Sequence, residues 1–255
     1  MMNLSDDSKI RVLQNREAVA EFAANTWIEI STASVAEKGS FTAALSGGTT
    51  PIAFYQQLAV CPHPLPWDKT HIFLADERFV PPDDKTSNYR IINEHLLGRI
   101  AMPKENIHPI PTQGLTLEQS AERYEADMRT FFKIGDNDVP VFDLIILGIG
   151  ADGHTASLFP GTVSSPGTKG LAIPVCADQS PAERISLALG VINNAKNICF
   201  LVTGEGKADA IKAIVEDKAS VLPAAQVKPT RGTVLFLMDQ GAASLLSNKG
   251  VEPRQ

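Results

Sequence analysis

The chain has few cysteines and no long apolar run, and both absences narrow the classes of protein to which it can belong. Its cysteines, Cys61, Cys176 and Cys199, are far apart and form no C-x-x-C pair. The sequence therefore predicts neither a disulfide framework nor a structural zinc site. No stretch approaches the ~18 consecutive apolar residues that a membrane-spanning helix needs. Residues 1–8 are partly acidic and lack the apolar core of a secretory signal, so we expect a cytoplasmic protein.

An excess of positive charge is also missing. The formal net charge of -6 argues against nonspecific binding to nucleic acid, because that binding needs a dense positive surface. A small anionic substrate remains possible where cations converge locally. With 255 residues, 44% of them hydrophobic, the chain can bury a sizeable core. We expect one domain over residues 1–255, present as a monomer or weak homo-oligomer.

What the sequence does contain is a regular alternation of strand and helix patterns. Strands are expected at residues 41–45, 70–74, 142–147, 185–189, 198–202 and 234–238. Helices are expected at 15–38, from Pro51 with Thr50 as the cap, from Ser87 to about 97, from Thr116 to about 132, at 206–215, and after 238. Strands that are apolar on both faces and alternate with helices are typical of an α/β fold. The expected architecture is a mostly parallel, Rossmann-like open sheet with helices on both faces.

Several polar segments directly follow the expected strands. Ligands of open parallel sheets bind outside the carboxyl ends of the strands, so four such strand ends are expected to meet in one crevice. The loop at residues 161–170 is rich in Pro, Gly, Ser and Thr and is a candidate lid over that crevice.

The first of these segments is a glycine loop between a strand and a helix. It consists of Ser46, Gly47, Gly48 and Thr49. Paired glycines let backbone amides approach an anion, and the following helix start favours negative charge, so a phosphate fits. A tight turn without a ligand fits equally well. Arg184 and Lys207 would complete such a site, although each alone is more typical of a solvated surface charge.

The second segment, residues 148–153, formally satisfies the G-x-G-x-x-G dinucleotide pattern. A dinucleotide turn should open a long helix, yet Pro160 follows within eight residues of Gly153, so we reject that interpretation. The loop instead places Asp152 and His154 near backbone amides. Since imidazole has an ordinary pKa of ~6.5, His154 is a candidate general base. The alternative is a solvated or merely hydrogen-bonded ring.

The third segment, Asp76-Glu77-Arg78, ends another strand. Asp76 and Arg78 could orient His154, bind sugar hydroxyls or supply a cation to a reacting carbonyl, or form only a surface ion pair. No metal site or cofactor is expected, because no second histidine or cysteine lies at ligand spacing from His154. The chain also lacks the G-x-S-x-G pattern of serine nucleophiles.

Five segments resemble the 6-phosphogluconolactonase family in order and spacing. They are LSGGTTP at 45–51, DERFVPPDD at 76–84 with SNY at 87–89, GIGADGHTASLFPG at 148–161, RIS at 184–186 and GEGK at 204–207. The resemblance extends from about residue 15 to 238, and the run at 152–160 is its most specific part. Ser186 and Ala151 depart mildly from the family, which more often has threonine and an acidic residue there.

The resemblance implies hydrolysis of 6-phospho-D-glucono-1,5-lactone in the oxidative pentose phosphate pathway. It implies that His154 takes a proton from the attacking water, that Asp152 places the histidine, and that backbone amides or Arg78 stabilise the oxyanion. The implied phosphate set is Gly47, Gly48, Thr49, Arg184 and Lys207.

Two other functions remain as alternatives. The glucosamine-6-phosphate deaminases and isomerases are similar, but their segment continues to an Asn-Glu-Pro with a catalytic glutamate, whereas residues 157–160 here are Ser-Leu-Phe-Pro. A non-catalytic sugar-phosphate sensor is the other alternative. Such a regulator needs a DNA-binding helix-turn-helix, for which we expect no room before the first helix.

Overall fold

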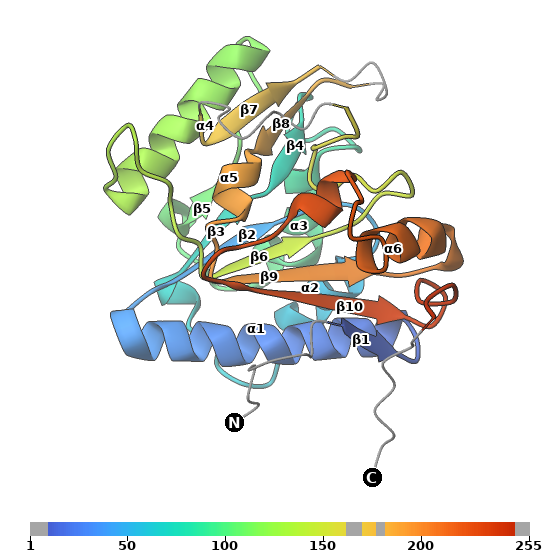
Figure 1. Cartoon of the computed structure of the whole chain (residues 1–255). Coiled ribbons are helices and arrows are strands. Elements are labelled where there is room, and N and C mark those ends of the chain that lie inside the picture. Colours follow the sequence, from blue (N-terminus) through green and yellow to red (C-terminus); the bar gives the residue numbers. More distant parts are fainter. Residues whose placement is uncertain (1–9, 162–169, 177–181, 248–255) are drawn as a thin grey trace.

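The structure, a computed structural model, describes residues 10–161, 170–176 and 182–247, and its strands form two sheets (Figure 1). The larger, wholly parallel sheet has the order β1-β10-β9-β6-β2-β3-β5. Its strands are β1 (Ile10–Leu13), β2 (Phe41–Leu45), β3 (Thr70–Leu74), β5 (Ile107–His108), β6 (Leu144–Leu147), β9 (Asn197–Val202) and β10 (Thr233–Asp239). The smaller sheet is antiparallel, with β4 (Asp76–Arg78), β8 (Arg184–Leu187) and β7 (Ala172–Val175) in that order.

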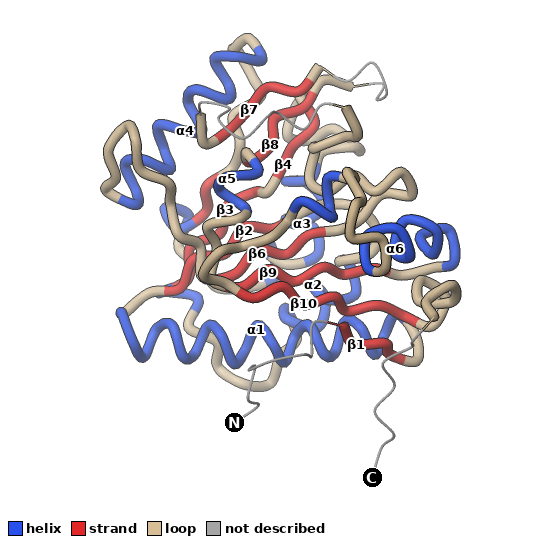
Figure 2. The backbone as a smooth tube through the Cα atoms, viewed as in Figure 1, coloured by secondary structure: helices blue, strands red, loops and turns tan. Residues whose placement is uncertain are grey.

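Helices cover the large sheet on both faces, as predicted (Figure 2). They are α1 (Arg16–Lys38), α2 (Ile52–Ala59), α3 (Asn88–His95), α4 (Leu117–Phe132), α5 (Leu189–Ile192) and α6 (Ala208–Val215). On one face, Trp27 of α1 packs on Phe41 of β2 with ring centroids 4.9 Å apart. On the other, Phe73 of β3 packs 5.3 Å from Phe131 of α4. Because Phe73 pairs with Ala44, three residues after Phe41, the two rings point to opposite faces. None of the helices in the described part of the chain is long and apolar enough to span a membrane.

Most predicted helix starts are confirmed. Asn15 caps α1 by accepting from the amide of Ala18, and Ser87 caps α3. Thr116 and Gln119 form the expected capping box at the start of α4. Gly39 ends α1 in the left-handed conformation with φ 81°, which glycine adopts without a steric penalty.

Other predictions were wrong in detail. Pro51 itself occupies the N-cap of α2 in a helical conformation, so Thr50 does not cap that helix. The strand predicted at 185–189 ends at Leu187 because α5 begins at Leu189. Residues 240–247 after β10 form turns rather than the predicted final helix. The short strands β1, β4, β5 and β7, each of two to four residues, were not predicted. The strand predicted at 142–147 begins only at Leu144. Most of the candidate lid, residues 162–169, lies outside the described residues.

One segment crosses from the large sheet to the small one. At Ala75 the chain leaves β3 and continues directly into β4. The amide of Ala75 still donates to Leu45 in the large sheet at 2.8 Å, while its carbonyl accepts from Leu187 in the small sheet at 2.8 Å. This crossing brings β4 and β8 next to the carboxyl ends of β2 and β6.

At the amino ends of the strands of the large sheet, a buried carboxylate joins four segments. Asp143, fully buried before β6, accepts from the amide and hydroxyl of Thr42 at 2.9 Å each. Its Oδ2 lies 2.7 Å from Lys38 Nζ, and its Oδ1 makes no hydrogen bond but lies 3.3 Å from Lys196 Nζ. A buried charge is tolerated only when paired in this way.

We expect Asp143→Ala to lower the free energy of unfolding by on the order of 3 kcal/mol, because Thr42 and two lysines lose their acceptor. Urea denaturation measures the change. The matched control is Lys196→Ala, which removes only a partly exposed partner and should cost at most about 1 kcal/mol. Equal losses in the two variants would contradict a central role for the carboxylate.

Candidate active site

A cavity of about 460 Å³ opens where the carboxyl ends of β2, β3, β6 and β9 meet. Its volume is typical of small-molecule sites. The sheet order runs outward in both directions from between β2 and β6, so this is a topological switch point. The described lining includes nine of the ten predicted site residues, namely Ser46, Gly47, Gly48, Thr49, Asp76, Arg78, His154, Arg184 and Lys207. The tenth, Asp152, is not in this lining but contacts the ring of His154.

The glycine loop follows β2 and is held from two sides. A Cβ on Gly47 would overlap with the side chain of Asn88 at the start of α3, so only glycine fits there. Gly48 has a φ of 91°, a conformation that other residues rarely adopt. Arg16, the first residue of α1, donates from its guanidinium to the carbonyl of Thr49. The loop is therefore fixed in shape beside the cavity.

His154 stands on the loop after β6 with its ring held by Asp152. Its Nδ1 lies 2.5 Å from Asp152 Oδ1, and its backbone amide donates to the same oxygen at 3.2 Å. A Cβ on Gly150 would overlap with the imidazole and with the Asp152 carboxylate, which explains the glycine there. Since Nδ1 is engaged, Nε2 is the nitrogen available to a ligand.

The surroundings of the Asp152 carboxylate favour its ionised form. Partial burial raises its pKa, but the backbone hydrogen bond from His154, the charge of that imidazole and the ring hydrogen bond together outweigh it. The net pKa lies below its ordinary value. A negative charge next to Nδ1 fixes the tautomer of the neutral ring and favours the imidazolium when a proton is taken up.

Asp76 is buried and connects the cavity to three neighbouring segments. Its Oδ2 accepts from the Ser157 hydroxyl at 2.7 Å, and its Oδ1 accepts from Asn88 Nδ2 at 3.2 Å. Arg184 Nη1 lies 4.0 Å from Oδ2. The contact with the His154 ring is made by Asp152.

Glu77, the next residue, is not part of the described cavity lining and instead binds the start of α3. Its carboxylate accepts from the amides of Asn88 and Tyr89 at 2.7 and 2.8 Å and from the Ser87 hydroxyl at 3.0 Å. Burial raises its pKa, and the hydrogen bonds from the start of the helix offset only part of that rise. A carboxylate at a helix N-terminus is also favoured by the helix dipole.

Positive charge is concentrated in the cavity although the chain as a whole is acidic. Among the described lining residues the cations are Arg16, Arg78, Arg184 and Lys207, and the one carboxylate is that of Asp76. Arg78 and Arg184 are directly opposite each other in the β4–β8 pair. Burial lowers the pKa of Arg184, and so does the charge of Arg78, against the opposing effect of Asp76 and Glu77. Like charges directly opposite each other in a strand pair are unfavourable, and an anion bound between them would reduce the repulsion.

Sequence patterns assigned no role in the site to three residues that the structure places there or next to it, namely Arg16, Asn88 and Ser157. Arg16 follows β1, and a parallel β1 would have placed it at the carboxyl edge of the sheet, but β1 was not predicted. Asn88 and Ser157 were quoted within motifs without a role. The amide of Ser157 donates to the Ser186 hydroxyl at 3.2 Å, a contact that the more usual threonine would also provide.

The described part of the cavity wall also holds polar atoms without hydrogen-bond partners. They are Arg16 Nε, Ser46 Oγ, Arg78 Nε and Asn88 Oδ1, all buried. Buried polar atoms in native proteins are nearly always paired. Their concentration around one cavity indicates a site arranged for a polar ligand.

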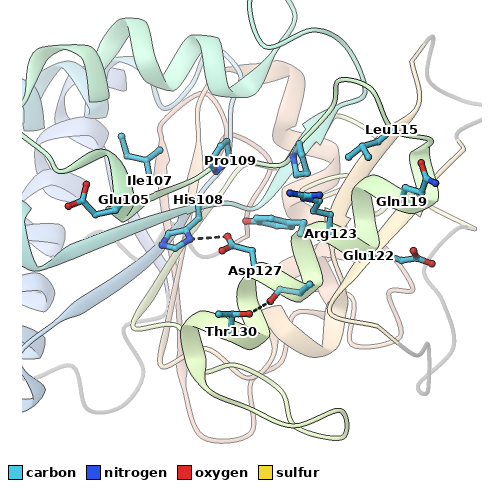
Figure 3. Close-up of a pocket in the computed structure, with 13 residues that line it drawn as sticks. Glu105, Ile107, His108, Pro109, Leu115, Gln119, Glu122, Arg123, Asp127 and Thr130 are labelled. Atoms are coloured by element: carbon cyan, nitrogen blue, oxygen red, sulfur yellow. Dashed lines mark hydrogen bonds and ion pairs between the residues drawn. The ribbon is translucent and has the colours of Figure 1, made fainter.

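A second hollow, of about 870 Å³, lies between residues 105–115 and α4 (Figure 3). Asp127 points toward His108 there, and their Oδ2 and Nδ1 atoms are 2.9 Å apart. Glu105, Glu122 and Asp127 offset the charge of Arg123. It has neither a glycine loop nor an excess of cations in its described lining, so the smaller cavity is the better anion site.

Comparisons with known proteins show which family the chain resembles. Residues 14–236 match the family model described as glucosamine-6-phosphate isomerases/6-phosphogluconolactonase. The 6-phosphogluconolactonase of Synechocystis is 38% identical over 240 residues, which cover 93% of this chain and 98% of the relative. That of Rattus norvegicus is 39% identical over 214 residues, covering 82% of each. The solved structure of 6-phosphogluconolactonase from Trypanosoma brucei has a TM-score of 0.84 and 29% identity, covering 95% of this chain and all of that one.

We expect inorganic phosphate to stabilise the protein against thermal unfolding, by about 2.7 kcal/mol at a hundredfold excess over its dissociation constant. Arg184→Met should abolish most of this stabilisation, since it removes a cation from the cavity. Arg123→Met, which removes the same charge from the second hollow, is the control and should retain it. Equal losses of stabilisation in the two variants would mean that phosphate binding depends only on the overall charge of the protein.

Proposed function

The chain belongs to the family of glucosamine-6-phosphate isomerases and 6-phosphogluconolactonases, and we propose that it hydrolyses 6-phospho-D-glucono-1,5-lactone to 6-phospho-D-gluconate. This reaction belongs to the oxidative branch of the pentose phosphate pathway. The observation that carries the proposal is the His154–Asp152 pair at a cavity whose described lining contains four cations and one carboxylate. The names of the relatives favour the lactonase over the other activity of the family.

In the proposed reaction His154 acts as general base. Its Nε2 removes a proton from a water molecule as the water oxygen attacks the C1 carbonyl of the lactone. Asp152 holds Nδ1 and stabilises the imidazolium that forms. When the tetrahedral intermediate collapses, the bond from C1 to the ring oxygen breaks. His154 then returns the proton to that oxygen, which leaves a carboxylic acid and a free hydroxyl.

The cations have two proposed tasks. Gly47, Gly48 and Thr49 would receive the phosphate with Arg184 and Lys207, because a phosphate monoester carries about 1.5 to 2 negative charges at pH 7. Arg78, which donates to the carbonyl of Thr86, would stabilise the oxyanion that develops on the lactone carbonyl.

A deaminase or isomerase is the alternative within the family. The proline of the expected Asn-Glu-Pro matches Pro160, so the position of its glutamate is occupied here by Phe159, which is buried with its ring centroid 4.6 Å from that of His154. Ser157 in the same segment is hydrogen-bonded to Asp76. No carboxylate is thus supplied by residues 157–160, which favours hydrolysis over that chemistry.

We expect His154→Ala to lower kcat for lactone hydrolysis by about 10²–10⁴-fold, the usual contribution of a general base. The substrate is generated in situ, and the spontaneous reaction is subtracted. His95→Ala, at the end of α3 and outside the cavity lining, is the control and should retain full activity. Absence of wild-type turnover would reject the function, whereas an active His154→Ala variant would reject only the mechanism.

The Asp152 carboxylate should support the base through its charge. Its lowered pKa keeps it ionised throughout the range from pH 5 to 8. A general base acts when unprotonated, so the rate should fall as the pH decreases. Asp152→Asn removes the negative charge that stabilises the imidazolium formed during attack, so kcat should fall. An unchanged kcat would show that Asp152 does not influence the base.

A further inference from the structure

Arg16 occupies a position that helix stability does not explain. It is the first residue of α1, directly after the cap Asn15. The N-terminus of a helix carries partial positive charge, so a cation is disfavoured in the first turn. Functional sites are where local preferences of this kind are commonly violated.

The contacts of Arg16 leave its charge available. Its guanidinium donates to the carbonyl of Thr49, and its Nε is buried without a hydrogen-bond partner. Within the described residues no carboxylate lies within 4.0 Å of it. The one acidic lining residue, Asp76, is engaged by Ser157 and Asn88. Among the described residues, no carboxylate therefore neutralises the positive charge of Arg16.

The position of this charge is defined by the glycine loop. Arg16 and Lys207 both line the cavity with Gly47, Gly48 and Thr49, and the Thr50 hydroxyl lies 3.5 Å from that of Thr203, four residues before Lys207. Arg16 thus reaches the loop from α1, while Lys207 reaches it from the end of β9. An anion bound on the loop would therefore have Arg16 on the side of α1 and Lys207 on the side of β9.

We propose that Arg16 is a substrate-binding residue that contacts the phosphate group and, through Thr49, holds the glycine loop that receives it. The inference rests on the proposed function for the identity of the substrate. The chemistry that Arg16 recognises is a phosphate monoester, for which a guanidinium offers several donors in a planar fork.

The test compares Arg16→Gln, which removes the charge but keeps an amide donor, with Arg16→Lys, which keeps the charge. Arg11→Gln makes the same charge change on β1, outside the cavity lining, and is the control. For each protein we would measure KM and kcat for the phosphorylated lactone, and the dissociation constant of inorganic phosphate by calorimetry. Unfolding midpoints without phosphate check that the variants are folded.

Arg16→Gln should raise KM and the phosphate dissociation constant roughly tenfold to a hundredfold, as expected for a hydrogen bond to a charged group, with kcat within about twofold. Arg16→Lys should recover part of the loss, and Arg11→Gln should match the wild type. Unchanged phosphate affinity in Arg16→Gln would overturn the inference. Equal losses in the Lys and Gln variants would also overturn it, leaving only the link to Thr49. A wild type without lactone turnover would instead reject the proposed function, while phosphate binding would still decide the role of Arg16.

Discussion

The site depends on the buried carboxylate of Asp76. It lies where the chain passes from the large sheet into the small one, and it binds Asn88 of α3 and Ser157 of the histidine loop. It also lies near Arg184 of β8. Without this acceptor, the three segments would lose a common partner, and two opposed arginines would lose a nearby negative charge. One acidic side chain therefore both connects the segments of the cavity wall and partly offsets the charge of the arginines beside it.

Charge is distributed differently at the two edges of the large sheet. At the edge before β6, the Asp143 carboxylate is matched by Lys38, Lys196 and Thr42, which is the arrangement expected of a structural ion pair. At the carboxyl edge, cations outnumber the carboxylate among the described lining residues, and several buried polar atoms there lack hydrogen-bond partners. Within the described part of the chain, the charges around Asp143 are thus paired internally, whereas the cavity has an excess of positive charge that suits an anionic ligand. This contrast, within one chain, marks the carboxyl edge as functional.

The sequence predicted the fold class because its longer strands and its capped helices carry strong local signals, such as the capping box at Thr116. It predicted the cavity because parallel strands place the segments that follow them at one edge. It could not place Arg16, since recognition of that residue required the four-residue strand β1, whose pairing with β10 is a contact between the two ends of the chain. Asp76 was recognised as a candidate, but its contact with Asn88 was likewise beyond local patterns, because that contact joins a helix start to a segment that passes from one sheet to the other.

The cation-rich cavity also has an energetic meaning. Arg78 and Arg184 lie opposite each other and partly buried, and like charges in such a pair repel. In the proposed function, a phosphate group would reduce this repulsion on binding. Because the phosphate takes no part in bond making, its binding energy would be available to hold the lactone carbonyl against His154, which would lower the entropic barrier to attack. The positions of the cations relative to His154 then matter more than their number, and a cation displaced by one side-chain length would bind phosphate without aligning the carbonyl.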